Sequence, residues 1–442
     1  MSTTKRAVLS IVLGIPLAFG SWPTSVAAQA RQTEQDSTLI LLQRLQRRLD
    51  SLERVIAQLR AASQDTTPAV DELAALRAAA GAAVEEAQQQ APPPPTDQGS
   101  RTRNLSALNP EVSVTGDVVG SFISPGGGEP NFSGTPREFE FSFQAALDPY
   151  SHTKIFVTRE EEFEIAGSPE AGAAEEPSFE VEEGYMYWVG LPGGFGAKIG
   201  KFRQEIGLYN RWHTHALFEV DRPLASRAFL GDDGLVQTGA SMTLPSLTFG
   251  PATNTVTVEV TKADNPVLFE GGNQLSYLGR FQSFWDLSSS THLQLGVTGV
   301  TGENDDAFIE SRLLGLDFAF RWVPPNQALY RDIQLKGEWY FAEKEVGPNA
   351  VGPDKLTGRG GYAQLNFRVD RRIILGTRAD YLEPFEDGPH IIGLVPTLSW
   401  WQSEWVRLRL QYNLLKTQGG ETNHTVLLQF VWAMGPHKHE TY

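Results

Sequence analysis

The sequence predicts an all-β transmembrane barrel of sixteen antiparallel strands, preceded by an α-helical coiled coil. Three observations predict this fold. Polar and apolar residues alternate in repeated runs from residue 111 onward, short and long connections alternate between these runs, and apolar residues recur every three or four positions between residues 42 and 59. A membrane barrel places its apolar side chains at alternate positions, so its average hydropathy stays as low as that of a soluble protein.

Composition excludes several classes of function. The 442 residues include 53 acidic and 37 basic side chains, and the formal net charge of -16 argues against nucleic acid as a partner. The absence of cysteine excludes disulfides, thiolate zinc sites, iron–sulfur clusters and cysteine nucleophiles. No Ser-His-acid spacing stands out, so we expect neither an enzyme nor a cofactor.

Residues 1–30 have the parts of a secretory signal peptide. Lys5 and Arg6 precede an apolar run that ends at Phe19, and the segment closes on the small-residue pattern Ala28-Gln29-Ala30. The alternative is a membrane anchor, but the apolar run is too short to span a bilayer as a helix. We therefore expect an exported protein.

Residues 31–90 are predicted to form a periplasmic coiled coil or helical segment. Its apolar positions follow the a and d spacing of a heptad. They are Leu42, Leu45, Leu49, Leu52, Ile56 and Leu59. The alternative is a lone amphipathic helix, which the stiff proline-rich linker at 91–110 makes less favourable because the linker separates the helix from the next domain. The mixture of Leu and Ile leaves a dimer and a trimer both open.

The barrel is predicted to occupy residues 111–442, with polar and apolar residues alternating along each strand. The expected strands are 111–122, 136–148, 151–160, 179–190, 194–202, 235–244, 247–262, 276–286, 290–301, 310–322, 331–343, 358–369, 372–382, 390–401, 404–416 and 424–434. Short turns, such as Leu244-Pro245-Ser246, alternate with long loops along the whole body. This alternation is typical of an up-and-down outer-membrane barrel and is not expected of a β-sandwich or a propeller.

Tryptophans mark one rim of the predicted barrel. Most of them flank short turns, as the aromatic girdle of a membrane barrel requires. They are Trp188, Trp285, Trp322, Trp400, Trp401, Trp405 and Trp432. Both ends of the body fall on this short-turn rim, which faces the periplasm in such barrels, so the coiled coil is expected to be periplasmic and could meet peptidoglycan.

The longest connection, 203–234, combines many apolar residues with charges of both signs. A loop of this kind can fold inward and narrow the pore, and the alternative is a surface loop at a subunit interface. The candidate residues for the constriction and for solute binding are Arg203, Arg211, Trp212, His213, His215, Arg222 and Arg227. The His-x-His pair in this loop is poor geometry for one metal, because side chains two apart in an extended segment point to opposite sides. Zinc binding with a neighbouring acid is the less favoured alternative.

Basic residues on the polar face of the strands are expected to line the lumen, where rings of Arg or Lys select anions. The candidates are Lys154, Lys198, Arg280, Arg321, Lys336, Arg368, Arg378, Arg407 and Arg409. Acidic residues share this face, at Glu138, Glu140, Glu182, Asp317, Glu338 and Asp380. Arg–carboxylate pairs that only neutralise one another are therefore an equally good interpretation. The remaining acidic run, from Glu160 to Glu183, is expected outside, either solvated or bridged by cations to lipopolysaccharide.

The segment Gly200 to Leu208, with Asp221-Arg222-Pro223-Leu224 further on, resembles the phosphate-selective porin O/P family. The N-terminal stalk is similar to that of the related dicarboxylate porins. This resemblance implies a sixteen-stranded homotrimeric porin with an inward-folded loop between strands five and six. The continuous arginine ladder and the lysine cluster of the family have no match here.

These observations favour an outer-membrane porin for passive diffusion of small hydrophilic, anionic solutes. Two alternatives remain: a specific channel for a metal chelate or siderophore, and a protein that tethers the outer membrane to the cell wall. The expected partners are outer-membrane lipid, lipopolysaccharide, two further copies of the chain and small solutes. A TonB-type receptor is disfavoured because about 22 strands and a plug would exceed this length.

Overall fold

The computed structural model describes residues 110–124, 129–161, 163–168, 178–304, 309–345, 355–385 and 388–435. All of them belong to the unit Asp97–Tyr442. The predicted signal peptide, coiled coil and proline-rich linker lie outside the described residues, apart from Pro110, the last residue of the linker.

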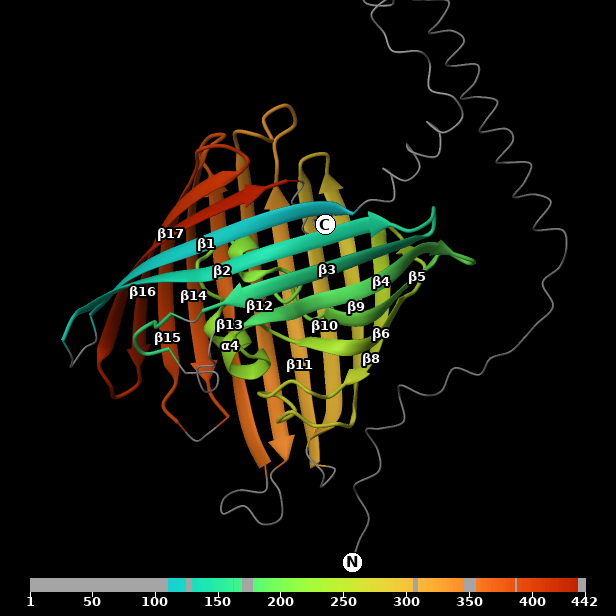
Figure 1. The fold of residues 1–442 in the computed structure, drawn as a ribbon, viewed down its shortest axis with the longest axis horizontal. Coiled ribbons are helices and arrows are strands. Elements are labelled where there is room, and N and C mark those ends of the chain that lie inside the picture. Colours follow the sequence, from blue (N-terminus) through green and yellow to red (C-terminus); the bar gives the residue numbers. More distant parts are fainter. Residues whose placement is uncertain are drawn as a thin grey trace, which may run out of the picture. The chain divides into compact units, whose positions relative to one another are not determined.

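The described residues form one closed antiparallel sheet. Its strands are β1 (Glu111–Ser124), β2 (Asn131–Ala146), β3 (Ser151–Glu160), β4 (Phe179–Leu191), β5 (Phe195–Arg203), β6 (Val236–Thr243), β7 (Leu247–Phe249), β8 (Ala252–Lys262), β9 (Leu275–Ser288), β10 (Thr291–Asn304), β11 (Ile309–Trp322), β12 (Asp332–Glu345), β13 (Lys355–Arg368), β14 (Ile373–Glu383), β15 (Ile391–Trp401), β16 (Val406–Thr417) and β17 (Thr422–Met434). Neighbours in sequence pair with one another, and β17 pairs with β1 to close the barrel (Figure 1). Apart from the three-residue β7, these are sixteen strands, so the predicted sixteen-stranded barrel is confirmed.

One predicted strand is interrupted. Residues 247–262 were expected to form a single strand after a turn at 244–246, but the chain reverses later, at Gly250 and Pro251. Pro245 lies between β6 and β7 and has no N–H to donate. It therefore interrupts the row of hydrogen bonds that both strands make with β8. Gly250 then adopts a φ of 61°, which favours glycine, and β7 folds back to pair with the start of β8. The predicted turn at 244–246 was therefore wrong.

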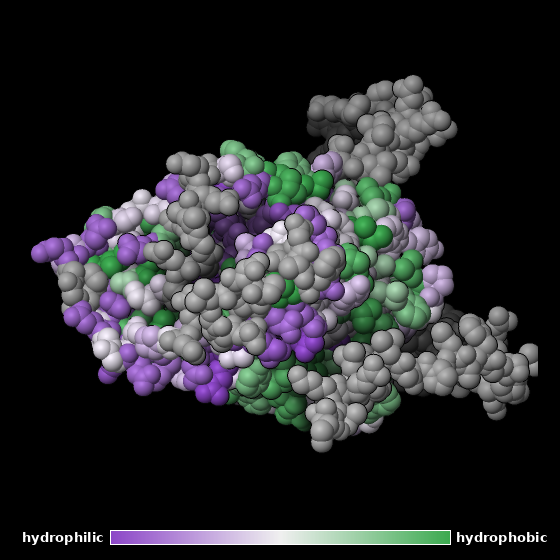
Figure 2. All heavy atoms as spheres, turned by 90° about the horizontal axis from the view of Figure 1, so that it is seen from below, coloured by the Kyte–Doolittle hydropathy of each residue, from purple (hydrophilic) through white to green (hydrophobic). Residues whose placement is uncertain are grey.

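The barrel wall is polar inside and apolar outside. On β11, Leu314 and Leu316 are each 44% exposed while Asp317 is buried, and on β16 Leu410 is exposed between the buried Arg409 and Gln411. Viewed from the end that Figure 1 draws at the bottom, green hydrophobic residues lie on much of the outer wall (Figure 2). Such a distribution is typical of a barrel that crosses a lipid bilayer. Among the described residues, no helix is long and apolar enough to span a membrane.

The chain between β5 and β6, residues 204–235, carries the only helices of the described residues: the 3-10 helix η1 (Thr214–Ala216) and the α-helix α4 (Leu224–Leu230). We call residues 204–235 the inner segment. Helix α4 packs against β12, β13 and β14. Small residues on β13 make room for it, because a Cβ at Gly360 would lie 3.0 Å from the Cβ of Ala225 and 2.6 Å from the carbonyl oxygen of Tyr381.

Replacing Gly360 by Leu is expected to lower the free energy of unfolding by about 1–3 kcal/mol, because the new side chain overpacks the contact with α4. The matched control is Gly299→Leu on β10, where an added Cβ meets no atom within 4 Å. Urea titration of the protein folded in lipid vesicles measures both variants. Equal stability of the two would contradict the close packing of α4 on the wall.

Candidate solute-binding site

The inner segment leaves and rejoins the wall through a narrow neck. The Gln204 N–H donates to the carbonyl of Leu235 over 3.0 Å. Asn210 closes the neck from within, since its Nδ2 donates to the carbonyls of Gln204 and Leu235 at 2.8 and 3.0 Å, and its Oδ1 accepts from the Leu235 N–H at 2.7 Å. The inner segment is therefore connected to the wall at the adjacent ends of β5 and β6.

Glu338 on β12 holds the first turn of the inner segment. Its Oε1 accepts hydrogen bonds from the backbone N–H groups of Leu208 and Tyr209, both at 2.8 Å, and from the Tyr362 hydroxyl at 2.7 Å. Gly207 takes a φ of 61° beside this carboxylate, and a Cβ there would overlap Glu338 Oε2. The turn therefore requires glycine for both its conformation and its close approach to the wall.

Three arginines predicted for the lumen wall hold the middle of the inner segment. Arg409 donates to the Leu217 carbonyl at 2.7 Å, Arg407 donates to the carbonyl of His215, and Arg378 donates to the carbonyl and carboxylate of Asp221 at 2.8 and 3.0 Å. All three arginines are buried. Their charges are thus directed at backbone and carboxylate oxygens of the inner segment.

Two other predicted wall arginines pair with carboxylates. Arg280 makes a two-pronged contact with Asp317 at 2.7 and 3.0 Å. Arg321 pairs with Asp332 at 2.8 Å, with 53% of its side chain exposed. The Nζ of Lys336 lies 4.6 Å from the centre of the Phe218 ring on the inner segment. Arg280 and Arg321 therefore form Arg–carboxylate pairs, which the sequence had left open as an alternative to lining the lumen.

The predicted constriction arginines differ in exposure. Arg222 is buried and donates to the carbonyls of Tyr209 and Trp212 at 3.2 and 2.6 Å, and burial lowers its pKa. Arg227 pairs with Asp232 and donates to Ser168 Oγ at 2.5 Å.

Arg203 is as buried as Arg222, whereas Arg211 is partly exposed. Arg203 binds Glu182 and the carbonyl of Asp233, and Arg211 lies 3.5 Å from Glu205 with 18% of its side chain exposed. Trp212 is partly buried and packs against a small apolar cluster. The buried members of that cluster are Tyr209, Leu217 and Tyr362.

The two loop histidines lie in a turn. The expectation of an extended backbone for His213-Thr214-His215 is wrong, because η1 brings the two ring centres to 5.9 Å. His213 lies 2.8 Å from both Glu140 and Glu183, and His215 lies 2.6 Å from Glu138. Burial alone would lower the pKa of His213, but the charge and hydrogen bond of Glu140 and the hydrogen bond of Glu183 outweigh it and raise the pKa to about 9.

Glu182 was expected on the inward polar face and was also counted with Glu183 in the exterior run. Both side chains are buried, so the inward prediction for Glu182 is confirmed and the exterior prediction is wrong. The pairing of β3 with β4 shifts register between Phe156 and Val157, so that Glu182 becomes an extra residue in β4. A β-bulge of this kind turns two consecutive side chains to one side, and both glutamates are buried. Sequence alternation contains no signal for this bulge.

A polar network on the inner segment was also missed. The Tyr209 hydroxyl donates to Gln364 Oε1 at 2.6 Å, and Gln364 Nε2 donates to Glu219 at 2.6 Å. Gln411 Oε1 accepts from the Val220 N–H at 2.7 Å. Burial raises the pKa of Glu219 against the opposing charge of Arg378. The two glutamines lie on the inward register of their strands, so alternation could have identified them.

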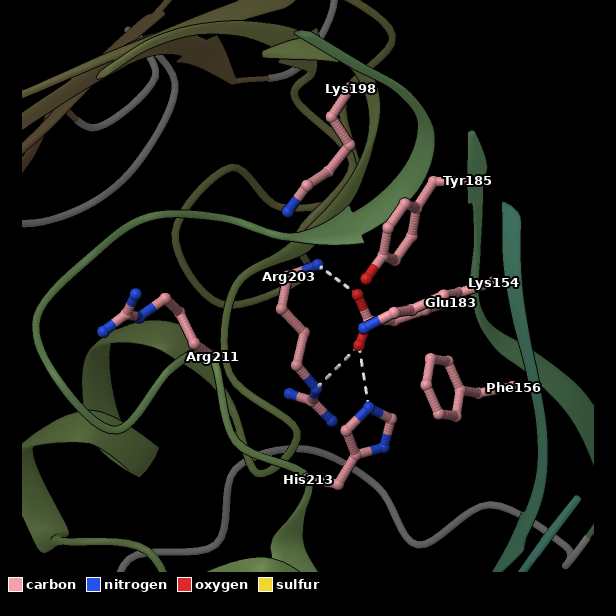
Figure 3. Close-up of a pocket in the computed structure, with 8 residues that line it drawn as sticks. All are labelled: Lys154, Phe156, Glu183, Tyr185, Lys198, Arg203, Arg211 and His213. Atoms are coloured by element: carbon pink, nitrogen blue, oxygen red, sulfur yellow. Dashed lines mark hydrogen bonds and ion pairs between the residues drawn. The ribbon is translucent and has the colours of Figure 1, made fainter. Parts of the chain in front are cut away.

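A small pocket lies where the inner segment meets β3, β4 and β5. It is lined by Lys154, Phe156, Glu183, Tyr185, Lys198, Arg203, Arg211 and His213. Figure 3 shows Glu183 between Tyr185 and His213, bonded to Arg203 and to the His213 ring. The Nζ of Lys198 lies 4.9 Å from the centre of the Tyr185 ring. Four basic side chains and one carboxylate line this pocket, so its lining carries an excess of positive charge, and we call it the electropositive pocket.

No family model matches the chain. A relative from Aquifex aeolicus (strain VF5), described as an uncharacterized protein, is 26% identical over 302 residues, covering 58% of this chain. The match spans 62% of that relative, so less than two thirds of its length is represented.

Solved structures share the barrel. The outer membrane channel DcaP of Acinetobacter baumannii matches with a TM-score of 0.49 and 11% identity, over 74% of this chain and 97% of that one. The anion-selective porin from Comamonas acidovorans matches with a TM-score of 0.51 and 10% identity, over 74% and 99% of the two chains. The match to the anion-selective porin shows that the fold is that of the outer-membrane porins. Membership of the phosphate-selective O/P family stays a prediction.

Proposed function

We propose that the protein is an outer-membrane porin through which small hydrophilic anions diffuse passively, past a constriction formed by residues 203–234. The observation that carries this proposal is the electropositive pocket at the edge of the inner segment. Its basic side chains come from three separate elements: Lys154 from β3, Lys198 and Arg203 from β5, and Arg211 from the inner segment.

Three other basic residues of the wall hold the inner segment in place. Arg378, Arg407 and Arg409 are held by the inner segment, so their charges are already directed at carbonyl and carboxylate oxygens. Within a narrow channel few waters screen a fixed charge, so a passing anion interacts strongly with basic side chains that border the open path. The net charge of -16 for the whole chain therefore does not determine the selectivity of the pore.

The double substitution Lys154→Gln and Lys198→Gln is expected to reduce the preference for chloride over potassium by a factor of roughly two to ten, because it removes two fixed positive charges beside the path. The zero-current potential across a planar bilayer in a KCl gradient measures this preference. The control is Lys416→Gln, which removes the same kind of charge from an exposed position at the end of β16.

Two results would refute the proposal: no conductance from the folded wild-type protein, or a double variant with the selectivity of the wild type.

We also propose that the barrel assembles as a homotrimer, as the resemblance to the O/P family implies. Light scattering of the detergent-solubilised protein, with the mass of the detergent subtracted, tests this stoichiometry.

A further inference from the structure

Beside the electropositive pocket, buried ligand-type side chains from three elements converge on one point. Glu138 and Glu140 project from β2, Glu182 from the bulge in β4, and His213 from the inner segment. One ligand-type atom of each lies within 4.8 Å of those of the other three, and all four residues are buried. We call these four residues the His213 cluster.

The His213 ring is oriented in the way that metal-bound histidines are oriented. Its Nε2 lies 2.8 Å from Glu183 Oε1, and its Nδ1 lies 2.8 Å from Glu140 Oε2 and 2.9 Å from Glu182 Oε2. When Nε2–H donates to Glu183, Nδ1 presents a lone pair to the other two carboxylates. A carboxylate behind the ring that fixes the tautomer and raises the basicity of the coordinating nitrogen is a recurring partner of metal-ligating histidine.

The carboxylates of the cluster are positioned in the same way. Glu138 accepts through Oε1 from His215 at 2.6 Å, and Glu182 accepts through Oε1 from Arg203. In each case the second oxygen, Oε2, is buried and makes no hydrogen bond within the described residues. His215 and Arg203 therefore hold one oxygen of Glu138 and of Glu182, and the other oxygen of each faces the centre of the cluster.

The buried negative charge in and around the His213 cluster also favours binding of a cation. Glu138, Glu140, Glu182 and Glu183 are at most 7% exposed. Burial of several carboxylates close together is unfavourable unless positive charge compensates them. Arg203 contacts this group through Glu182 and Glu183, and the His213 and His215 imidazoles contact Glu140 and Glu138.

We propose that the His213 cluster binds one divalent transition-metal ion of the zinc type, which links the inner segment to β2 and β4. One imidazole nitrogen with carboxylate oxygens is a ligand set found at zinc sites, whereas magnesium and calcium take oxygen ligands only. Ligands of a tetrahedral ion with bonds of about 2.0–2.2 Å lie roughly 3.4 Å apart. The widest separation in the cluster must therefore close by roughly 1–1.5 Å, which rotation of the glutamate side chains can supply.

The test is metal binding by the untagged full-length protein, stripped with a chelator and dialysed against zinc chloride. We expect about one zinc per chain and, by X-ray absorption, a shell of nitrogen and oxygen atoms at about 2.0–2.2 Å that includes one imidazole. Glu140→Gln is expected to abolish this binding. Glu183→Gln, which alters only the partner behind the ring, is expected to weaken zinc binding by about 10–100-fold.

The matched control is Glu180→Gln, an exposed glutamate on β4 two residues from Glu182, which is expected to bind zinc as the wild type does. Retention of the barrel in each variant is checked by its heat-dependent mobility on a gel. Stoichiometry well below one zinc per wild-type chain, wild-type affinity in folded Glu140→Gln, or an absorption spectrum without an imidazole would each overturn the proposal. The wild-type stoichiometry and spectrum test the site even if a variant fails to fold.

Discussion

Replacing residues 206–233 with a two-residue Asn-Gly turn is expected to raise the single-channel conductance by roughly twofold or more, because the narrowest section of a pore dominates its resistance. The same change is expected to reduce ion selectivity, because ions in the wider pore pass farther from the fixed charges of the wall and more water screens those charges. Single-channel recording in planar bilayers measures both quantities.

The barrel should tolerate this replacement. β5 and β6 pair from Gly196 with Thr243 to Arg203 with Val236, and the backbone of Gln204 already bonds to that of Leu235. A two-residue Asn-Gly turn matches the twist of antiparallel strands and can close this hairpin. The wall arginines that the inner segment covers would then face water, where their charges are well solvated.

The matched control replaces residues 418–421, the exposed turn between β16 and β17, with the same Asn-Gly turn. We expect its conductance to equal that of the wild type. If the variant lacking 206–233 folds and also conducts as the wild type does, the inner segment does not limit the pore, and the proposed constriction is wrong.

Most of the barrel could be predicted from the sequence because one physical requirement repeats in every strand. A wall with lipid on one side and polar groups on the other must alternate at every residue, as Leu410 does with Arg409 and Gln411. The position of the turn between 244 and 252 was predicted wrongly because residues in a turn need not alternate between lipid and polar surroundings. Pro245 and Gly250 both signal a turn, and only the pairing of β7 with β8 decides which of them reverses the chain.

The candidate site was harder to predict because its geometry depends on contacts between distant segments. The β-bulge that turns both Glu182 and Glu183 inward leaves no trace in the local pattern. The η1 turn at His213 is held by Arg407, which donates to the carbonyl of His215 from 192 positions along the chain. Residue types therefore predicted which side chains lie inside the barrel, but not which of them pair with one another.

Replacing Arg378 by Met is expected to lower the free energy of unfolding by about 3–5 kcal/mol, because it leaves buried carboxylates without their counter-charge. Arg378 is fully buried and donates to Asp221 at 3.0 Å and to Asp380 at 2.8 Å. The control is Arg359→Met. The Arg359 Nη2 bond to Glu383 is 2.9 Å long, but the two side chains are 56% and 33% exposed, so we expect a loss below about 1 kcal/mol.

Urea titration of the protein in lipid vesicles measures both losses, and limited proteolysis reports whether the inner segment has separated from the wall. A second substitution sharpens the test, because Asp221→Asn removes one of the two stranded charges. Residues that share an ion pair are coupled, so the variant with both Arg378→Met and Asp221→Asn should be less destabilised than the sum of the single changes. Additive effects, or equal losses for Arg378→Met and Arg359→Met, would show that Arg378 does not hold the inner segment through Asp221.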